Sequence, residues 1–270
     1  MFIVKLGGSL ISHKDEYCAA NLPVIQAFAR IVRSRWAELA GRLLLVIGGG
    51  SYGNAISRRY KLEDSSLPWR AVDLPMTTLG MLEWLSLIAG VFREEGVPCY
   101  PFQTNSYLVC RDGRPLQAFL APVKQALAMG LLPLLSGDLV FDTVRKFVIF
   151  SSDAIPELFL AELPVRRVVM VTNVPGVLDD LRRGGGLVAR ITRDNRDTVL
   201  RVARGSQHQD VSGGMRTKVE ALLRIADAGV EGVICDGRTP EVLLPAMFDI
   251  VPPGTFVSPD GPDFAVGPPR

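Results

Sequence analysis

Two lysines in glycine-rich surroundings are the residues of this chain best suited to chemistry. Lys5 ends an apolar stretch and precedes Gly7-Gly8-Ser9, and Lys218 follows the pair Gly213-Gly214. Only six of the 30 basic residues are lysines, and a third, Lys14, lies soon after the first glycine pair. A compact ammonium group on a flexible stem does a different job from a planar guanidinium. We therefore expect these lysines to compensate negative charge on a transferred group.

Polar, glycine-rich turns follow several apolar stretches. The segment Gly48-Gly49-Gly50-Ser51-Tyr52-Gly53-Asn54 comes directly after the apolar run 43–46 and before an expected helix. Consecutive glycines bare backbone N–H groups, and a helix N-terminus adds the positive end of its dipole. Similar turns occur at Ser136-Gly137-Asp138 and Ser151-Ser152-Asp153, where Asp153 is suited to orient lysines. Anion-binding turns combined with lysines are what phosphoryl transfer requires, because it depends on positioning and charge compensation.

Two other glycine motifs were weighed against this interpretation. Gly48, Gly50 and Gly53 match the dinucleotide fingerprint literally, which leaves a nicotinamide-dependent oxidoreductase as a weaker alternative. That fold also needs a second strand ending in an acidic residue, whereas segment 62–73 contains Pro68 and is typical of a loop. No lysine follows a glycine anywhere in the chain, so the nucleoside triphosphate-binding motif G-x-x-x-x-G-K-[ST] is absent.

The elements that must position these residues alternate along the chain. Apolar runs predict strands at 2–6, 42–47, 97–102, 131–135, 147–150, 167–171, 232–235 and 255–257. Helical spacing predicts helices at 22–39, 55–61, 77–95, 119–129, 154–163, 216–228 and 242–248. Such alternation indicates an α/β fold with a mainly parallel sheet. We expect one domain over 1–270, because no linker or repeat precedes the Pro- and Gly-rich tail 258–270.

Composition limits the classes of function. A net charge of +2 is too small to indicate nucleic-acid binding, and no apolar run approaches the roughly 20 residues of a membrane span. No signal peptide is visible, so we expect a cytoplasmic protein. Four scattered cysteines and two histidines predict reduced thiols and no metal site.

Six motifs in register carry a resemblance to a known family. They are the two glycine turns with Lys5, the turns at 136–138 and 151–153, Thr172-Asn173-Val174-Pro175-Gly176-Val177, and Ser212-Gly213-Gly214-Met215-x-x-Lys218. In this order they resemble the amino acid kinase family, most closely its isopentenyl phosphate kinase and fosfomycin resistance kinase branch. The resemblance implies a three-layer αβα sandwich and a homodimer. It also implies an acceptor lobe over about 1–165 and a lobe for MgATP over about 166–257.

The resemblance also implies roles for individual residues. Lys5 and Lys218 would flank the transferred phosphoryl group, Lys14 would contact phosphates, and Asp153 would hold the lysines together. ATP would contact Lys5, Lys218 and a set of loop residues: Gly7, Gly8, Ser9, Thr172, Pro175, Gly176, Gly213, Gly214 and Met215. The acceptor's phosphate or phosphonate would be held by Gly49, Gly50, Ser51, Asn54, Gly137, Ser151 and Ser152. ATP and Mg²⁺ are the implied cofactors.

Asn54 departs from the family pattern, which normally has histidine at this position. Asparagine donates a neutral hydrogen bond but cannot carry the charge of an imidazolium. The nucleotide loop departs too, with Asn173 and Pro175 at positions where aspartate is common. We expect an ATP-dependent kinase for a fosfomycin-like phosphonate or an isopentenyl phosphate-like monophosphate. A weakened nucleotide or metabolite sensor, or a kinase for a carboxylate acceptor, is the alternative.

Two further questions stay open at this point. His13 or Arg58 could supply the positive charge that Asn54 lacks. An apolar acceptor tail would need an apolar pocket near helix 77–95, and Met76, Leu79 and Leu82 could line it or belong to the core.

Overall fold

The structure is a computed structural model that describes residues 1–13, 16–179, 186–204 and 214–258. An eight-stranded sheet runs through it in the order β12-β14-β13-β9-β1-β2-β6-β3. Neighbouring strands are parallel except for the pair β13 and β14. The strands are β1 Phe2–Leu6, β2 Leu43–Ile47, β3 Cys99–Phe102, β6 Leu132–Ser136, β9 Arg167–Thr172, β12 Arg190–Ile191, β13 Glu231–Asp236 and β14 Thr255–Val257. The expected α/β class with a mainly parallel sheet is confirmed.

The central strands β1, β2, β6 and β9 are buried along their whole length. Parallel strands covered on both faces read as continuous apolar runs, which is why the sequence identifies them well. In the register of β1, Lys5 lies between Val46 of β2 and Met170 of β9. The carboxyl ends of these strands therefore meet at one edge of the sheet, where ligands of open α/β sheets bind.

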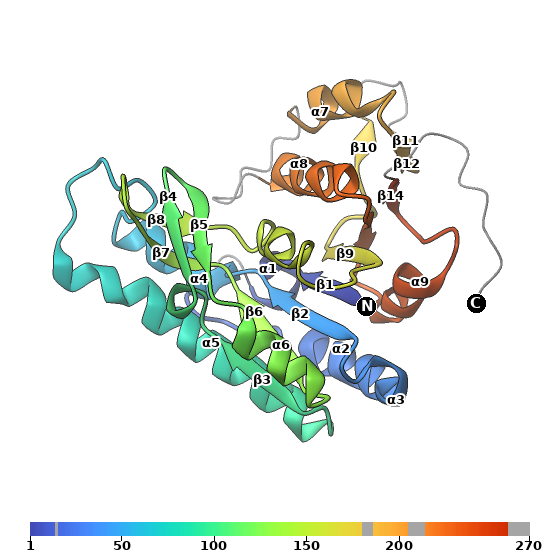
Figure 1. Ribbon diagram of the computed structural model, residues 1–270, viewed down its shortest axis with the longest axis horizontal. Helices are drawn as coiled ribbons and strands as arrows, with labels where there is room; N and C mark the ends of the chain where they lie inside the picture. The colour runs from blue at the N-terminus through green and yellow to red at the C-terminus, as the bar shows by residue number, and fades with distance from the viewer. Residues whose placement is uncertain (14–15, 180–185, 205–213, 259–270) are drawn as a thin grey trace.

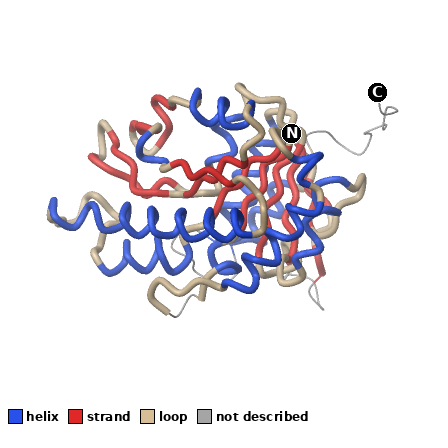
Figure 2. Tube along the Cα trace, turned by 90° about the horizontal axis from the view of Figure 1, so that it is seen from below, coloured by secondary structure: helices blue, strands red, loops and turns tan. Residues whose placement is uncertain are grey.

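Helices cover both faces of this sheet (Figures 1 and 2). One face packs against α1 Gly8–Ile11, α2 Leu22–Ser34, α3 Trp36–Leu39, α4 Gly50–Arg59, α5 Leu74–Glu94 and α9 Leu243–Phe248. The other face packs against α6 Ala121–Ala128, the 3₁₀ turn η3 Ile155–Phe159, α7 Arg196–Arg204 and α8 Gly214–Asp227. Two apolar cores thus sandwich the sheet, and the three-layer αβα architecture is confirmed.

A second, four-stranded sheet was not expected as a unit. Its order is β5-β4-β7-β8, and Figure 1 shows it beside α4 and α5. The strands are β4 Leu108–Arg111, β5 Arg114–Ala118, β7 Asp138–Asp142 and β8 Lys146–Phe150, of which only β8 was predicted. Strand β5 is almost wholly exposed and shows no alternation of apolar residues, so its sequence carries no strand signal.

Asp142 joins the two hairpin turns of this small sheet. Its carboxylate accepts backbone N–H groups from Asp112 and Gly113 on one turn and from Val144 and Arg145 on the other. Burial would raise the pKa of Asp142, but these four hydrogen bonds outweigh it and hold the pKa at about 2. A single side chain therefore holds both turns in place.

Two helix predictions were wrong in their extent. The helix expected at 154–163 is the shorter 3₁₀ turn Ile155–Phe159, which has Pro156 in its first turn and buries Ile155, Pro156 and Phe159. The helix expected from residue 55 begins at Gly50, inside the glycine segment. Smaller elements complete the chain: η1 Ala71–Asp73, η2 Thr104–Ser106, η4 Pro240–Val242, and the hairpin β10 Leu178–Asp179 with β11 Gly186–Leu187.

Helix α5 is more apolar than the sequence analysis allowed. With the turn before it, residues 71–94, it is long and apolar enough to cross a membrane by length and composition alone. Its Met81, Trp84, Ile88 and Phe92 are nevertheless packed in the core that faces α2. We therefore describe it as a helix of the folded domain.

Candidate active site

The two glycine turns touch each other at the carboxyl ends of β1 and β2. A Cβ on Gly8 would lie 2.3 Å from the backbone nitrogen of Gly50, and a Cβ on Gly48 would lie 2.4 Å from the nitrogen of Gly8. Gly50 also has a positive φ of 49°. Only glycine permits this approach, so the glycines serve a contact between two loops as well as any ligand.

Four backbone N–H groups belong to the residues where these turns meet. Within the described part of the chain, the amides of Gly8, Ser9, Gly49 and Gly50 donate no hydrogen bond to another residue. They belong to the first turns of α1 and α4 or to the residue before, where helical amides have no partner in their own helix. Two helix N-termini that face the same space form an anion-binding site.

Ser51 has a different role from the one expected. Its N–H donates to Ser12 Oγ over 2.9 Å, while its hydroxyl accepts from Ala19 N at 3.0 Å and donates to Ala19 O at 3.2 Å. Ser12 Oγ in turn donates to Gly8 O over 2.8 Å. Ser51 therefore fastens the segment around residue 19 to the glycine turn instead of offering a free hydroxyl to an acceptor. The sequence analysis missed Ser12, because no motif marks it.

The structure brings Lys5, Asp153 and Lys218 together from three distant parts of the chain. Lys5 Nζ lies 2.7 Å from Asp153 Oδ1, and Lys218 Nζ lies 3.4 Å from Asp153 Oδ2. All three side chains are buried. Burial alone would raise the pKa of Asp153, but the two ammonium charges outweigh it and hold the pKa at about 2. Asp153 stays ionised and holds two cations side by side, which prepares them to receive a polyanion.

The turn at 151–153 packs against the turn at 136–138. A Cβ on Gly137 would lie 2.9 Å from the nitrogen of Ser152, so the two backbones meet at this glycine. Ser151 Oγ accepts a hydrogen bond from the N–H of Asp153 over 3.2 Å and so orients the residue between the lysines. Gly137, Ser151 and Ser152 thus lie next to the lysine pair, as expected for acceptor-side residues.

The loop that follows β9 is shaped by Thr172. Its hydroxyl accepts from Val174 N at 3.2 Å and donates to Val174 O at 2.9 Å. Further on, Gly176 lies so close to Thr255 that a Cβ would come within 2.5 Å of its hydroxyl oxygen. Pro175 is exposed at the tip of the loop.

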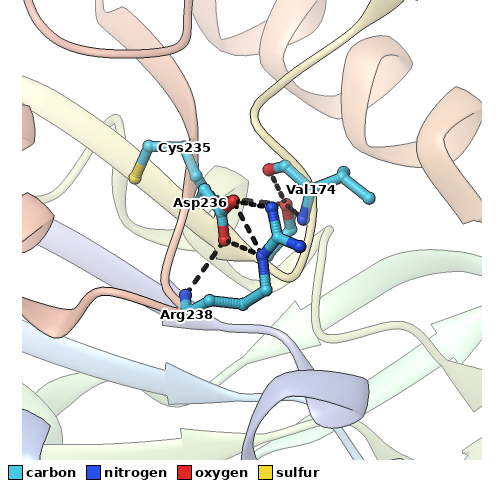
Figure 3. Close-up of polar contacts among 5 residues, drawn as sticks. Val174, Cys235, Asp236 and Arg238 are labelled. Atoms are coloured by element: carbon cyan, nitrogen blue, oxygen red, sulfur yellow. Dashed lines mark hydrogen bonds and ion pairs between the residues drawn. The ribbon is translucent and has the colours of Figure 1, made fainter.

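An ion pair that no motif announced lies beside this loop. Asp236 ends β13 next to Thr172, and its carboxylate accepts hydrogen bonds from Arg238 Nε at 2.9 and 3.0 Å (Figure 3). Met215, with Gly214, opens α8 on the side of the sheet that carries Lys218. Lys14 and Gly213 lie outside the described residues.

Asn54 lies half-buried in α4, one turn after the free amides of the glycine segment. Arg58, one turn further on, pairs with Glu63 at 3.5 Å and has more than half of its side chain exposed. His13 is exposed. The cations that the described structure pairs at the edge of the sheet are Lys5 and Lys218, which both contact Asp153.

Comparison with known proteins places this site in a family. The model of the amino acid kinase family matches residues 1–236. An isopentenyl phosphate kinase of Methanothermobacter thermautotrophicus is 28% identical over 251 residues, which cover 89% of this chain and 92% of that protein. Another, of Methanocaldococcus jannaschii, is 26% identical over 228 residues and covers 82% of this chain and 85% of that protein.

Solved structures agree with these sequence relatives. An X-ray structure of isopentenyl phosphate kinase superposes with a TM-score of 0.76 at 25% identity, covering 96% of this chain and 100% of that one. The family match includes both glycine turns, Asp153 and Lys218, which are the residues that build the site. The chain is an ATP-dependent phosphotransferase and belongs to the amino acid kinase family.

Proposed function

We propose that this enzyme transfers the γ-phosphoryl group of ATP to a small monophosphate of the isopentenyl phosphate type. The observation that carries the proposal is the pair of buried lysines held on Asp153, together with four backbone amides that have no hydrogen-bond partner among the described residues. Such a site is suited to a reaction between two anions, because it supplies positive charge without a group that must form a covalent bond. The coverage of isopentenyl phosphate kinases along nearly the whole chain supports the choice of acceptor.

In this proposal each group has a defined task. Lys5 and Lys218 flank the phosphoryl group in transfer, Gly7, Gly8 and Ser9 bind the ATP phosphates, and Gly49 and Gly50 bind the acceptor phosphate. These amides fit phosphate oxygens, and the carboxylate of Asp153 is paired with both lysines. Mg²⁺ would therefore be carried by the phosphates of ATP, which is its usual mode of binding in kinases.

The two sides of the sheet edge receive different ligands in this proposal. The acceptor binds the lobe 1–165, and MgATP binds the lobe 166–257 through the loop of Thr172 and the start of α8. Leu79 and Leu82 are exposed on α5, so they do not belong to the core, which was one of the two interpretations that the sequence left open. Met81 lies on the inner face, where its sulfur is 3.0 Å from the position of a Cβ on Gly53. We therefore assign contact with the acceptor to Met81, and the homodimer and the cytoplasmic location stay predictions.

A substrate panel tests this function directly. We expect ADP release with isopentenyl phosphate or a related short monophosphate, and none with small carboxylates such as N-acetylglutamate. Phosphonates of the fosfomycin type are tested separately. Faster turnover of these phosphonates than of the monophosphates would indicate an acceptor like that of the fosfomycin resistance kinases. The proposal is wrong if no acceptor releases ADP. Binding of ATP without turnover would instead favour the sensor alternative.

Asn54 is expected to limit the affinity for the acceptor. In Asn54→His, a protonated imidazole would add a charge-assisted hydrogen bond to the acceptor phosphate, which contributes about 1.5–3 kcal/mol against about 1 kcal/mol for a neutral bond. We therefore expect kcat/KM for the acceptor to rise about tenfold at pH 6 and less at pH 8, where the imidazole is neutral.

The pH dependence separates this role from a general effect on the fold. The matched control is Asn54→Gln, which keeps a neutral amide and should not acquire the gain at low pH. An Asn54→His enzyme with unchanged or lower kcat/KM at both pH values would show that residue 54 does not contact the acceptor phosphate.

A further inference from the structure

A polar cluster lies between α5, η2 and the start of β7, in the part of the molecule that otherwise packs apolar side chains. Its carboxylate is Asp138, which accepts from Thr78 Oγ1 at 3.3 Å and from Gln103 Nε2 at 3.4 Å. Asn105 Nδ2 donates to Thr78 Oγ1 over 2.9 Å and completes the chain of contacts. Thr78, Gln103 and Asn105 are each partly exposed, so the cluster is not sealed inside the core.

The charge of Asp138 is poorly compensated. The residue is 2% exposed, and in the described part of the chain no lysine or arginine nitrogen lies within 4 Å of it. Its one short hydrogen bond comes from the N–H of Leu139, at 2.7 Å. Asp153 pairs with two lysines, whereas the donors around Asp138 in the described part of the chain are all neutral: Thr78, Gln103 and the backbone of Leu139 and Asn105. Burial raises the pKa of Asp138 to about 6, against the lowering effect of these hydrogen bonds.

Ser136 provides an independent observation at the same place. It is fully buried, and its Oγ has no hydrogen-bond partner among the described residues. Side chains alternate along β6, so Ser136 points to the same face as Leu134, which packs in the core that contains α5. A buried hydroxyl without a partner is uncommon, since it forfeits about 1–3 kcal/mol of hydration.

The cluster adjoins the acceptor side of the site. Ser136 is paired in register with Ile47, the residue directly before the glycine segment. Gly137, between Ser136 and Asp138, packs on the turn that leads to Asp153. Met81 lies one helical turn after Thr78 and contacts the same glycine segment from below. An acceptor whose phosphate lies on the amides of Gly49 and Gly50 would thus extend its carbon chain toward these polar groups.

We propose that Asp138 and Ser136 bind a hydroxyl group on the carbon chain of the acceptor, so that the substrate is a short monophosphate with a hydroxyl and not a plain hydrocarbon tail. The inference rests on the proposed function and specifies its substrate class. The hydroxyl would donate to the carboxylate of Asp138 and accept from Ser136 Oγ. Ser136 Oγ would then gain a partner, and an acceptor without the hydroxyl would leave this oxygen buried and unpaired among the described residues.

Two matched acceptors test the inference. Butyl phosphate and 4-hydroxybutyl phosphate differ by one hydroxyl, and ADP release measures kcat and KM for each. We expect kcat/KM to be about 10–100 times higher for the hydroxylated acceptor, mostly through KM, because a site that hydrogen-bonds a hydroxyl discriminates against its absence. Equal values for the two acceptors would overturn the inference, and so would turnover of isopentenyl phosphate without turnover of 4-hydroxybutyl phosphate.

Variants identify the residues that discriminate. Asp138→Asn and Ser136→Ala should each reduce the ratio of the two kcat/KM values several-fold. Ser136→Ala removes no hydrogen bond between described side chains, so this variant still tests the inference if Asp138→Asn fails to fold. Asp142→Asn, at the other end of β7, is the control for loosening of the small sheet and should leave the ratio unchanged. A ratio that neither site variant alters would overturn the inference.

The remaining outcomes separate the inference from the function on which it rests. A higher kcat/KM for 4-aminobutyl phosphate than for 4-hydroxybutyl phosphate would show that the cluster binds an ammonium group. This result would overturn the proposal that it binds a hydroxyl group. Absence of ADP release with every monophosphate would overturn the proposed function itself. Turnover of both butyl compounds at equal rates would leave the function standing while the inference fails.

Discussion

Replacement of Lys218 by alanine is expected to lower kcat by about 10²–10³-fold, the usual effect of removing one group that stabilises charge in the transition state. Lys218 Nζ lies 3.4 Å from Asp153 Oδ2 at the carboxyl edge of the sheet, where the phosphoryl group would pass. The cation acts on charge that redistributes during transfer, so the loss should fall on kcat more than on the binding of ATP.

The fold should survive this substitution. Asp153 keeps Lys5 at 2.7 Å, so its buried charge retains a partner in the variant. Steady-state ADP release gives kcat and KM, and calorimetry gives the dissociation constant of ATP. Lys124→Ala is the matched control, because this exposed lysine pairs with Glu162 far from the site and should leave kcat unchanged.

The same measurements decide between an enzyme and a sensor. A kinase loses turnover in Lys218→Ala and retains most of its affinity for ATP. If the variant kept the kcat of the unsubstituted chain, Lys218 would have no role in transfer. If the unsubstituted chain bound ATP without any turnover, the retained lysines would serve ligand binding alone.

Replacement of Arg167 by alanine is expected to lower the free energy of unfolding by about 3–5 kcal/mol, the range for removing one partner of a buried ion pair. Arg167 is among the largest fully buried side chains of the protein and pairs with Glu231 at 2.7 Å. Its Nη1 also donates to the carbonyls of Ala246, Met247 and Asp249 at the end of α9. The variant would leave a carboxylate and three carbonyls without their donor.

Chemical denaturation measures this effect. Arg167→Lys should recover part of the lost free energy of unfolding. A lysine ammonium keeps the positive charge but cannot reach all four acceptors as the planar guanidinium group does. Arg224→Ala is the control, because Arg224 binds Glu157 with two hydrogen bonds but is more than half exposed, and exposed pairs contribute about 0–1 kcal/mol. Equal losses in Arg167→Ala and Arg224→Ala would show that burial of Arg167 does not determine its contribution.

Prediction from the sequence succeeded where a pattern is local and strong. The buried strand β1 was placed at its observed bounds. It failed for β4, β5 and β7, because a sheet that is half exposed is stabilised by pairing across the chain and not by an apolar run. The hydrogen bonds between Ser51 and Ala19 are a further contact that no local pattern indicated.

The sequence by itself therefore determined the fold class, the family and the residues that carry charge, because buried strands and glycine-rich turns leave marks in neighbouring positions. The tertiary structure alone decided which of those residues meet. Asp153 contacts Lys218 across 65 positions of sequence, and Asp138 meets Thr78 only through the packing of β7 on α5. No local pattern records such contacts, since parallel strands bring together ends that are distant in the chain. That is why the sequence predicted which lysines take part in the site. The burial of Asp138 without a lysine or arginine partner among the described residues became visible only in the structure.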